Sequence, residues 1–335
     1  MRTLPLVVVG GSAGGIEALL ELAAGLPADL PAAVLVIVHT SQRPDTALAR
    51  ILARAGPLPA ALADDGAPLR PGHILVAGPG RHLMTSRTGT VNLSAAPRVN
   101  QHRPAIDVLF ASAARTHGPH VTAAVLSGAL DDGAAGAALI ARAGGRVTVQ
   151  DPADARFSSM PRAVQRSVPD AVAARASTLG PVLADLAACM AHTEDIPMSE
   201  PRDTAPATGA TAPAAGDLDL VRDDGTVPSR IVCPECSGAL ARIDLPHISY
   251  YRCHVGHQYG PQSLEAAQRE AAEAKLWSAV AALEEHAALA RHLTENMLDT
   301  VPPDYVTAAQ HSADLAASLR ERIVIATPTA PPDPE

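Results

Sequence analysis

The chain has 335 residues, which is enough for two domains and a large buried core. Its net charge of −9 argues against a nucleic-acid-binding protein, which usually carries a basic face, and no apolar run approaches the ~20 residues of a membrane-spanning helix. With only two Phe, four Tyr and one Trp, the core has to be built mainly from Ala, Leu and Val.

The N-terminal stretch MRTLPLVVVGG has no cleavage region after its apolar run, so it does not read as a signal peptide. We expect it to form the first strand of a cytoplasmic protein without membrane insertion. Four cysteines are too few for a disulfide scaffold.

Residues 4–180 alternate apolar strands with helical stretches, a pattern typical of a parallel sheet covered on both faces. The predicted strands are 4–10, 32–39, 120–128 and 145–150. The predicted helices are 14–25, 44–55, 104–117, 133–143 and 178–192. Short alternating runs with turns in residues 73–94 predict antiparallel strands at an edge. The expected fold class is therefore α/β, with a doubly wound, mainly parallel sheet and an antiparallel hairpin.

The rest of the chain changes character several times. A stretch rich in Pro, Ala, Thr and Asp predicts a flexible linker. The expected parts are the α/β domain (1–192), the linker (193–229), a Cys/His module (230–260), a helical region (261–325) and a tail (326–335).

Two helices are predicted in the helical region, over residues 262–299 and 303–325. Apolar residues recur at helical intervals along the first, namely Leu276, Val280, Leu283, Leu289 and Leu293. This amphipathic face either packs on the chain's own domains or forms a dimer or partner contact, and the sequence leaves both open.

A glycine-rich segment over residues 10–15 joins the first strand to the first helix. The dinucleotide fingerprint needs glycine where this chain has Ser12, and a Walker loop needs Lys and Ser/Thr where this chain has Ile-Glu, so nucleotide binding is disfavoured. Residues 10–14 do match G-x-S-x-G at a strand-to-helix turn. Such a turn exposes a serine nucleophile beside helix N-terminal amides. An ordinary tight turn is the alternative.

A serine nucleophile needs a base, and His39 stands at the end of the second predicted strand. Ligands of an open parallel sheet bind beyond the carboxyl ends of its strands, so His39 can face Ser12. Asp131 and Asp132 follow a third strand and precede a helix, where an aspartate either orients the base or caps the helix. Together these residues favour nucleophilic catalysis.

Six separated motifs resemble the CheB family of chemotaxis protein-glutamate methylesterases over roughly residues 4–190. They are GGSAGG with Ser12, VIVHT with His39, LSGALDDGAAG with Asp132, AGPGRHLM, HRPAIDVLFASAA and VQDPADARFSSMPRAV. The resemblance implies hydrolysis of γ-glutamyl methyl esters on methyl-accepting chemotaxis receptors, with glutamine deamidation in some members. It also implies a catalytic domain over residues 1–192 that needs no cofactor for its chemistry.

The same resemblance assigns roles to individual residues. Ser12 matches the nucleophile and His39 the general base. Asp132 matches the acid that orients the histidine through its Nδ1–H, because the family's aspartate directly precedes glycine. Asp131 is then expected to serve only as a helix-start residue, worth roughly 1 kcal/mol. Backbone amides near Ala13 and Ala129 are expected to hold the oxyanion.

Three departures from the family pattern stand out. Better-known members have Ser-Thr-Gly-Gly where this chain has Ser-Ala-Gly-Gly, and Gly-Met-Gly where this chain has Gly128-Ala129-Leu130. Both changes line the expected site, where they would contact the substrate rather than the triad. Because the first predicted strand starts at residue 4, we also expect a stand-alone form without the family's receiver domain.

The C-terminal module carries cysteines and histidines with metal-ligand spacing. Cys233, Cys236 and Cys253 form C-x2-C-x16-C, and a histidine follows. Thiolates with imidazole suit one tetrahedral, structural Zn²⁺, with His257 as the expected fourth ligand and His254 as the alternative. The module resembles a zinc-ribbon extension found on some stand-alone methylesterases. A metal-free pair of turns is the competing interpretation.

Two main hypotheses for function follow from the sequence. The first is a receptor-modifying serine carboxylesterase. The alternative is a catalytically inactive scaffold or interaction protein in a chemosensory-type pathway, which the complete Ser/His/Asp set argues against.

Overall fold

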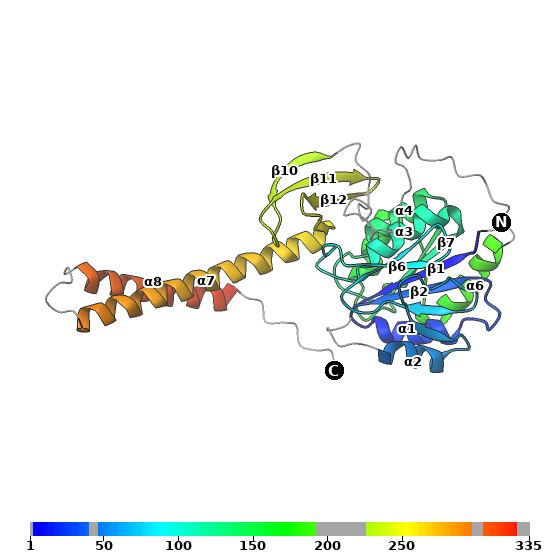
Figure 1. Ribbon diagram of the computed structural model, residues 1–335, viewed down its shortest axis with the longest axis horizontal. Helices are drawn as coiled ribbons and strands as arrows, with labels where there is room; N and C mark the ends of the chain where they lie inside the picture. The colour runs from blue at the N-terminus through cyan, green and yellow to red at the C-terminus, as the bar shows by residue number, and fades with distance from the viewer. Residues whose placement is uncertain (1–2, 40–45, 192–225, 297–303, 327–335) are drawn as a thin grey trace. The chain divides into compact units, whose positions relative to one another are not determined.

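A seven-stranded parallel sheet forms the centre of the N-terminal region (Figure 1). The computed structural model describes residues 3–39, 46–191, 226–296 and 304–326. The strands run in the order β3-β4-β2-β1-β7-β8-β9, and all six pairings are parallel. Their bounds are β1 (Leu6–Gly11), β2 (Ala33–Val38), β3 (Ala60–Leu62), β4 (Ile74–Val76), β7 (Val121–Val125), β8 (Arg146–Gln150) and β9 (Val172–Ala174).

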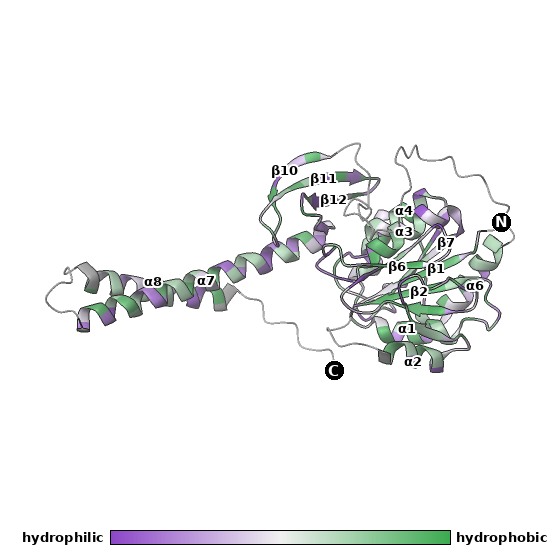
Figure 2. Ribbon diagram, in the orientation of Figure 1, coloured by the Kyte–Doolittle hydropathy of each residue, from purple (hydrophilic) through white to green (hydrophobic). Residues whose placement is uncertain are grey.

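Helices cover both faces of this sheet, and the alternation of side chains along each strand explains why. On β1, Leu6 and Val8 pack into one core, whereas Val7 and Val9 pack into another. The central strands are accordingly hydrophobic throughout (Figure 2). The first core includes α3 (Ile106–His117), α4 (Ala134–Arg142) and α5 (Ser159–Ser167). The second includes α1 (Gly15–Ala24), α2 (Thr46–Ala55) and α6 (Ala176–Ala191). A short 3₁₀ turn (Gly118–His120) follows α3.

The predicted α/β class is thereby confirmed, with two corrections in residues 73–94. The strands β5 (His82–Thr85) and β6 (Val91–Ser94) do form an antiparallel hairpin, but as a separate two-stranded sheet. Residues 74–76, predicted as part of the antiparallel group, instead pair in parallel with β2 and β3. Their short apolar run carries no signal of strand direction, because the direction is set by the crossover connections that precede them.

The Cys/His module is a four-stranded antiparallel sheet of β10 (Val227–Val232), β11 (Ala239–Leu245), β12 (Ile248–Cys253) and β13 (Gln258–Tyr259). The predicted boundary at residue 230 was wrong, since β10 already begins at Val227. Residues 193–225 of the predicted linker lie outside the described residues.

This module belongs to the same compact unit as the parallel sheet, a unit that ends at Leu264. Tyr250 of β12 is fully buried and shares a third core with Val99, Val108 and Ala135. The module is therefore packed on the α3–α4 side of the α/β domain by apolar burial, which contributes about 25 cal/mol per Å² of buried apolar surface.

The second unit, from Glu265 onward, consists of the remainder of α7 (Pro261–Asn296) together with α8 (Asp304–Ala326). Val280, Ala316 and Ile323 are buried between the two helices. Of the predicted amphipathic face, Leu276 and Leu289 are 44% and 56% exposed. Val280 of this face is buried and Leu283 packs against the same cluster, so part of the face packs within the chain and the exposed leucines leave the predicted partner contact open.

Among the described helices, none combines the length and the apolar character that crossing a membrane would require. Of the predicted tail, residue 326 ends α8 and residues 327–335 lie outside the described part of the chain.

Candidate active site and metal centre

Ser12 lies in a tight turn directly after β1. The turn is closed by the amide of Gly15, which donates to the carbonyl of Ser12 at 2.9 Å, and it requires the left-handed backbone of Gly14 (φ 68°). The amide of Ser12 donates to the carbonyl of Ser127 at 2.9 Å. A Cβ atom on Gly128 would lie only 2.9 Å from Cβ of Ser12, so glycine permits this close approach.

His39 and Asp132 come from the loops that follow the neighbouring strands. The amide of His39 donates to the carbonyl of Gly11 at 3.0 Å, which extends the β1–β2 pairing by one residue. Asp132 lies in the loop between β7 and α4. The chain leaves β1 for β2 on one side and returns to β7 on the other, and the carboxyl ends of parallel strands at such a reversal form the usual binding crevice.

Asp132 is held by four groups in a buried position. Oδ2 lies 3.0 Å from Nε2 of His39 and accepts the Ile106 amide at 2.8 Å. Oδ1 accepts the Asp107 amide at 3.0 Å and the Asn100 side-chain nitrogen at 2.8 Å. The first turn of α3 thus provides two free backbone donors for the carboxylate.

The orientation of the histidine corrects one expectation. Nε2, rather than the predicted Nδ1, faces Asp132. The ring orientation depends on the backbone and neighbours of His39, which residue spacing does not reveal. Nδ1 is the ring nitrogen of His39 that does not face Asp132.

The two buried carboxyl groups of the site, Asp132 and Asp107, have pKa values shifted in opposite directions. Burial by itself raises the pKa of Asp132, but the hydrogen bond and charge of His39, followed by His102 and the Ile106 amide, bring that pKa below its ordinary value. For Asp107, burial and then the nearby Asp132 charge raise the pKa well above its ordinary value. Asp132 is therefore the anionic member of the pair.

The loop that precedes α3 carries no local signal of a role in the site, although it lies against His39. The ring of His102 stacks on the ring of His39, with centroids 3.7 Å apart and an interplanar angle of 13°. Burial, and then the proximity of His39, lowers the pKa of His102 to about 4, so this ring is neutral near pH 7. The quoted motif HRPAIDVLFASAA contained His102, and nothing local in it signalled the stacking.

Asp131 does not act as a cap for α4. The N-cap of α4 is Gly133, with no side-chain cap. The carboxylate of Asp131 instead accepts the backbone amides of Gln262 and Ser263, at 2.8 and 3.0 Å, and the Ser263 hydroxyl. The expectation of a helix-start role at α4 was wrong, because a partner more than a hundred residues away in sequence captures the side chain.

A cavity of about 450 Å³ opens beside His39. Its wall includes the carboxyl end of β2, the 78–80 turn and the loop before α3. Two arginines, Arg98 and Arg103, line it together with His102. The cavity therefore opens onto the His39 ring, and Ser12 is not among its lining residues.

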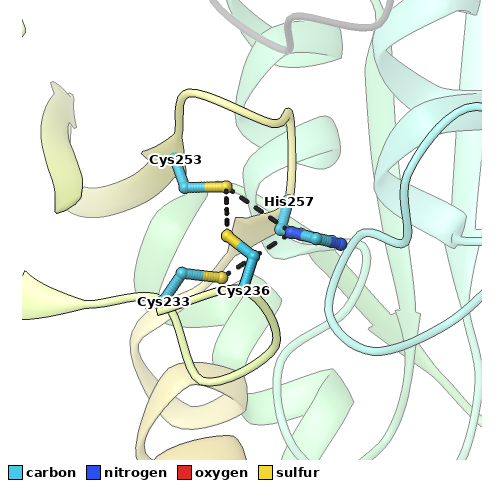
Figure 3. A group of neighbouring side chains, drawn as sticks. All are labelled: Cys233, Cys236, Cys253 and His257. Carbon is cyan, nitrogen blue, oxygen red and sulfur yellow. Dashed lines mark hydrogen bonds between the residues drawn. The ribbon is translucent and has the colours of Figure 1, made fainter. Parts of the chain in front are cut away.

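The four predicted metal ligands lie together in the C-terminal module (Figure 3). Their ligand atoms all lie within 4.8 Å of one another. Sγ of Cys253 lies 3.5 Å from Nδ1 of His257 and 3.7 Å from Sγ of Cys236, and Sγ of Cys233 lies 3.7 Å from the same Nδ1. A tetrahedral ion with Zn–S bonds of ~2.3 Å and a Zn–N bond of ~2.0 Å requires ligand separations of this size.

The surroundings of His257 suit a metal ligand as well. Its Nε2 lies 3.3 Å from Glu235, whose other oxygen accepts the hydroxyl of Tyr259 at 2.8 Å. A carboxylate behind a ligating imidazole orients the ring and raises its basicity. His254, the alternative, is exposed and lies outside the cluster.

A model of the CheB methylesterase family matches residues 7–180. The chain is 42% identical over 165 residues to protein-glutamate methylesterase/protein-glutamine glutaminase 5 of Myxococcus xanthus, covering 48% of this chain and 47% of the relative. It is 41% identical over 177 residues to protein-glutamate methylesterase/protein-glutamine glutaminase 3 of Anaeromyxobacter dehalogenans, covering 50% and 52%. The chain thus matches about half the length of these curated relatives.

A solved structure is also similar. The CheB methylesterase catalytic domain of Thermotoga maritima aligns with a TM-score of 0.52 at 29% identity. The alignment covers 54% of this chain and 98% of that domain. The residues matched by the family model, 7–180, contain Ser12, His39 and Asp132.

Proposed function

Because the chain belongs to the CheB methylesterase family, we propose that it is a protein-glutamate methylesterase that hydrolyses γ-glutamyl methyl esters on methyl-accepting chemotaxis receptors. Glutamine deamidation at the same site is part of the proposal, since the curated relatives carry both names. One observation supports it above the others. The buried carboxylate of Asp132 lies 3.0 Å from the imidazole of His39, and these residues follow the two strands that flank β1, the strand that leads into the turn with Ser12.

The proposed reaction is acyl transfer. Ser12 Oγ attacks the ester carbonyl while Nδ1 of His39 takes its proton, and Asp132 stabilises the resulting imidazolium through Nε2. Backbone amides near Ala13 and Ala129 are proposed to stabilise the oxyanion. The imidazolium then protonates the departing methoxide. His39 then deprotonates a water molecule that attacks the acyl-enzyme carbonyl, and the imidazolium returns this proton to Ser12 Oγ as the acyl bond breaks. This step leaves a glutamate side chain on the receptor and regenerates the serine.

The chemistry in this proposal uses amino-acid side chains alone. We propose that the Cys233, Cys236, Cys253 and His257 cluster holds Zn²⁺ in a structural role. The four residues fill a tetrahedron, which leaves no open position for a substrate. Three cysteine thiols kept available as ligands also fit the proposed cytoplasmic location, since thiols stay reduced there.

We further propose that the α7–α8 hairpin contacts a second copy of the chain. A two-helix pair has a small buried core, and Leu276, Leu289 and Leu315 remain 44%, 56% and 43% exposed. Light scattering of the full chain tests this. A monomer at all concentrations would contradict it, and Leu289→Glu is expected to shift a dimer toward monomer.

The test of the main proposal is methanol release from receptor membranes carrying methylated glutamates. The full chain is expected to release methanol, and Ser12→Ala is expected not to. A fluorophosphonate probe provides the second measurement, because it labels an activated serine independently of the receptor. A folded chain that neither labels at Ser12 nor releases methanol would point instead to an inactive scaffold.

A further inference from the structure

A short segment between the last metal ligand and the body of α7 lies against the loop that precedes α3. We call residues 258–263 the connecting segment. The amide of Asn100 donates to the carbonyl of Gln258 at 2.8 Å, and the amide of Gly260 donates to Oδ1 of Asn100 at 2.7 Å. Val99 also forms a parallel bridge with Gln258. The connecting segment therefore holds both the backbone and the side chain of Asn100.

Asn100 is fully buried and extends this contact to the proposed catalytic acid. Its side-chain nitrogen donates to Asp132 at 2.8 Å and to Asp107 at 2.7 Å. A reversed amide would place oxygen against two carboxyl groups and nitrogen against the N–H of Gly260. The Gly260 bond therefore selects the orientation in which Asn100 donates to Asp132.

The backbone of the loop before α3 has an unfavourable conformation that contacts with the rest of the protein have to stabilise. Asn100 and Gln101 both have left-handed backbone conformations, with φ of 51° and 66°. Two consecutive residues of this kind persist only where the surroundings fix them. The next residue, His102, stacks on His39. The loop fixed by the connecting segment thus contacts both the acid and the base of the proposed triad.

A second contact joins the connecting segment to the residue before Asp132. Gly260 precedes α7 and has no side chain to cap it, and Asp131 provides the capping oxygens for the first turn. The approach is so close that a Cβ on Gly260 would lie 2.5 Å from Oδ2 of Asp131. The start of α7 and the loop of the proposed acid therefore form one hydrogen-bonded unit.

The metal cluster lies next to this unit in the chain. His257 directly precedes Gln258, and its carbonyl accepts the amide of Cys253 at 3.0 Å. Arg252 and Gln258 pair between β12 and β13. A metal ion bound to Cys253 and His257 would fix the two ends of the turn from which the connecting segment emerges.

We propose that the connecting segment is a positioning element for Asp132, through which metal bound in the C-terminal module supports turnover at the active site. The proposal rests on the proposed esterase function. The connecting segment touches no substrate, and it acts by fixing Asn100 and Asp131 on either side of the acid. Metal removal is therefore expected to lower turnover although the metal takes no part in the chemistry.

The first experiment measures kcat and KM on a small ester for the full chain, before and after metal removal by a chelator. We expect kcat of the wild type to fall about tenfold, with little change in KM, and to return when Zn²⁺ is added. In Gly260→Ala, kcat is expected to be low before metal removal, because the added Cβ displaces the connecting segment from Asp131. Metal removal is then expected to change kcat less than about twofold, since the contact between the metal cluster and the loop of Asp132 is already broken. Full turnover by the wild type after the metal has been released would overturn the proposal.

A matched pair of variants tests the Asp131 contact. Ser263→Ala removes the hydroxyl that donates to Asp131 and is expected to lower kcat, whereas Ser278→Ala removes an exposed hydroxyl of the same helix that bonds only within it. Equal kcat values for these two variants, together with wild-type turnover by Gly260→Ala, would contradict a positioning role.

Hydrogen–deuterium exchange provides a readout independent of esterase activity. The amides of Ile106 and Asp107, which bond to Asp132, are expected to exchange faster after metal removal and in Gly260→Ala. Peptides from α6 serve as the internal control and are expected not to change. Unchanged exchange at residues 99–107 would overturn the proposal. A metal-loaded chain without any esterase activity would refute the proposed function instead, and the exchange data would still decide whether the connecting segment holds Asp132.

Discussion

The active site and the metal cluster lie in one compact unit but are assembled in different ways. Ser12, His39 and Asp132 are far apart in the sequence and meet because their strands are neighbours in a parallel sheet. The metal ligands come from a short stretch, residues 233–257, and meet through turns between antiparallel strands. The first site is positioned by the register of a large sheet and the second by local turns.

The two sites also differ in what compensates their charge. Backbone amides of α3 and the Asn100 side chain already stabilise the Asp132 carboxylate. In the metal cluster, three sulfur atoms and an imidazole lie at van der Waals distances, and a bound cation would stabilise their ionised forms. The fold therefore already stabilises the Asp132 carboxylate at the candidate active site, whereas the charge of the Cys/His cluster would be compensated by the proposed metal ion.

The largest effect is expected from the proposed triad. Ser12→Ala, His39→Ala and Asp132→Asn should each lower turnover of a small ester by about 10³- to 10⁴-fold, because the three groups act as one unit. The double variant Ser12→Ala/His39→Ala should be little worse than either single variant. Thermal unfolding checks that each protein is folded. Near-normal turnover by Ser12→Ala would mean that Ser12 is not the nucleophile and that the glycine-rich loop binds a ligand instead.

The metal cluster should respond next most strongly. Protein purified without a histidine tag is expected to contain about one equivalent of zinc, and Cys233→Ser or His257→Ala should lose most of it. The matched controls are Cys189→Ser, an exposed cysteine outside the cluster, and His254→Ala. Metal analysis reads out all four variants. If His254→Ala lost zinc and His257→Ala kept it, the fourth ligand would be His254 and not His257.

A smaller effect concerns the buried histidine that supports the loop before α3. His82 donates from Nε2 to the Pro97 carbonyl and accepts the Ala105 amide at Nδ1, and burial lowers its pKa to about 4. Between pH 6.5 and 4 the unfolded state binds this proton and the folded state does not, so stability falls as the pH drops. Urea unfolding should show that the free energy of unfolding falls between pH 7 and pH 5 by about 2 kcal/mol more in the wild type than in His82→Gln.

That comparison isolates His82, because the other buried groups titrate in both proteins. Equal pH dependence of the two unfolding free energies would mean that folding does not lower the pKa of His82. The metal cluster should contribute equally to the pH dependence of both proteins, so its contribution cancels in the comparison.

The smallest effect is expected at Leu130, which has a left-handed backbone with φ of 65°. The better-known family members have glycine at this position. Leu130→Gly should raise the free energy of unfolding by about 1 kcal/mol relative to Leu130→Ala, because alanine keeps the Cβ that strains this conformation. Urea unfolding measures the difference. Equal stability of the two variants would mean that the active-site loop carries no backbone strain here.

The sequence by itself determined the class of fold and the candidate residues of both sites. Apolar runs alternating with helical stretches predict a parallel sheet, and glycine around Ser12 predicts a strand-to-helix turn, because both depend on local backbone preferences. The spacing of Cys233, Cys236, Cys253 and His257 likewise predicts a metal cluster, since short turns fix the distances between ligands. These patterns are visible in a linear chain.

Only the tertiary structure decided how the sites are supported. It placed Nε2 of His39 toward Asp132, turned Asp131 away from α4 to cap α7, and brought Asn100 between the acid and the C-terminal module. Each of these contacts joins residues from different elements, and most span large separations in sequence. No local propensity encodes such a contact, because its energy arises only when packing of the whole unit has excluded water from the groups that meet.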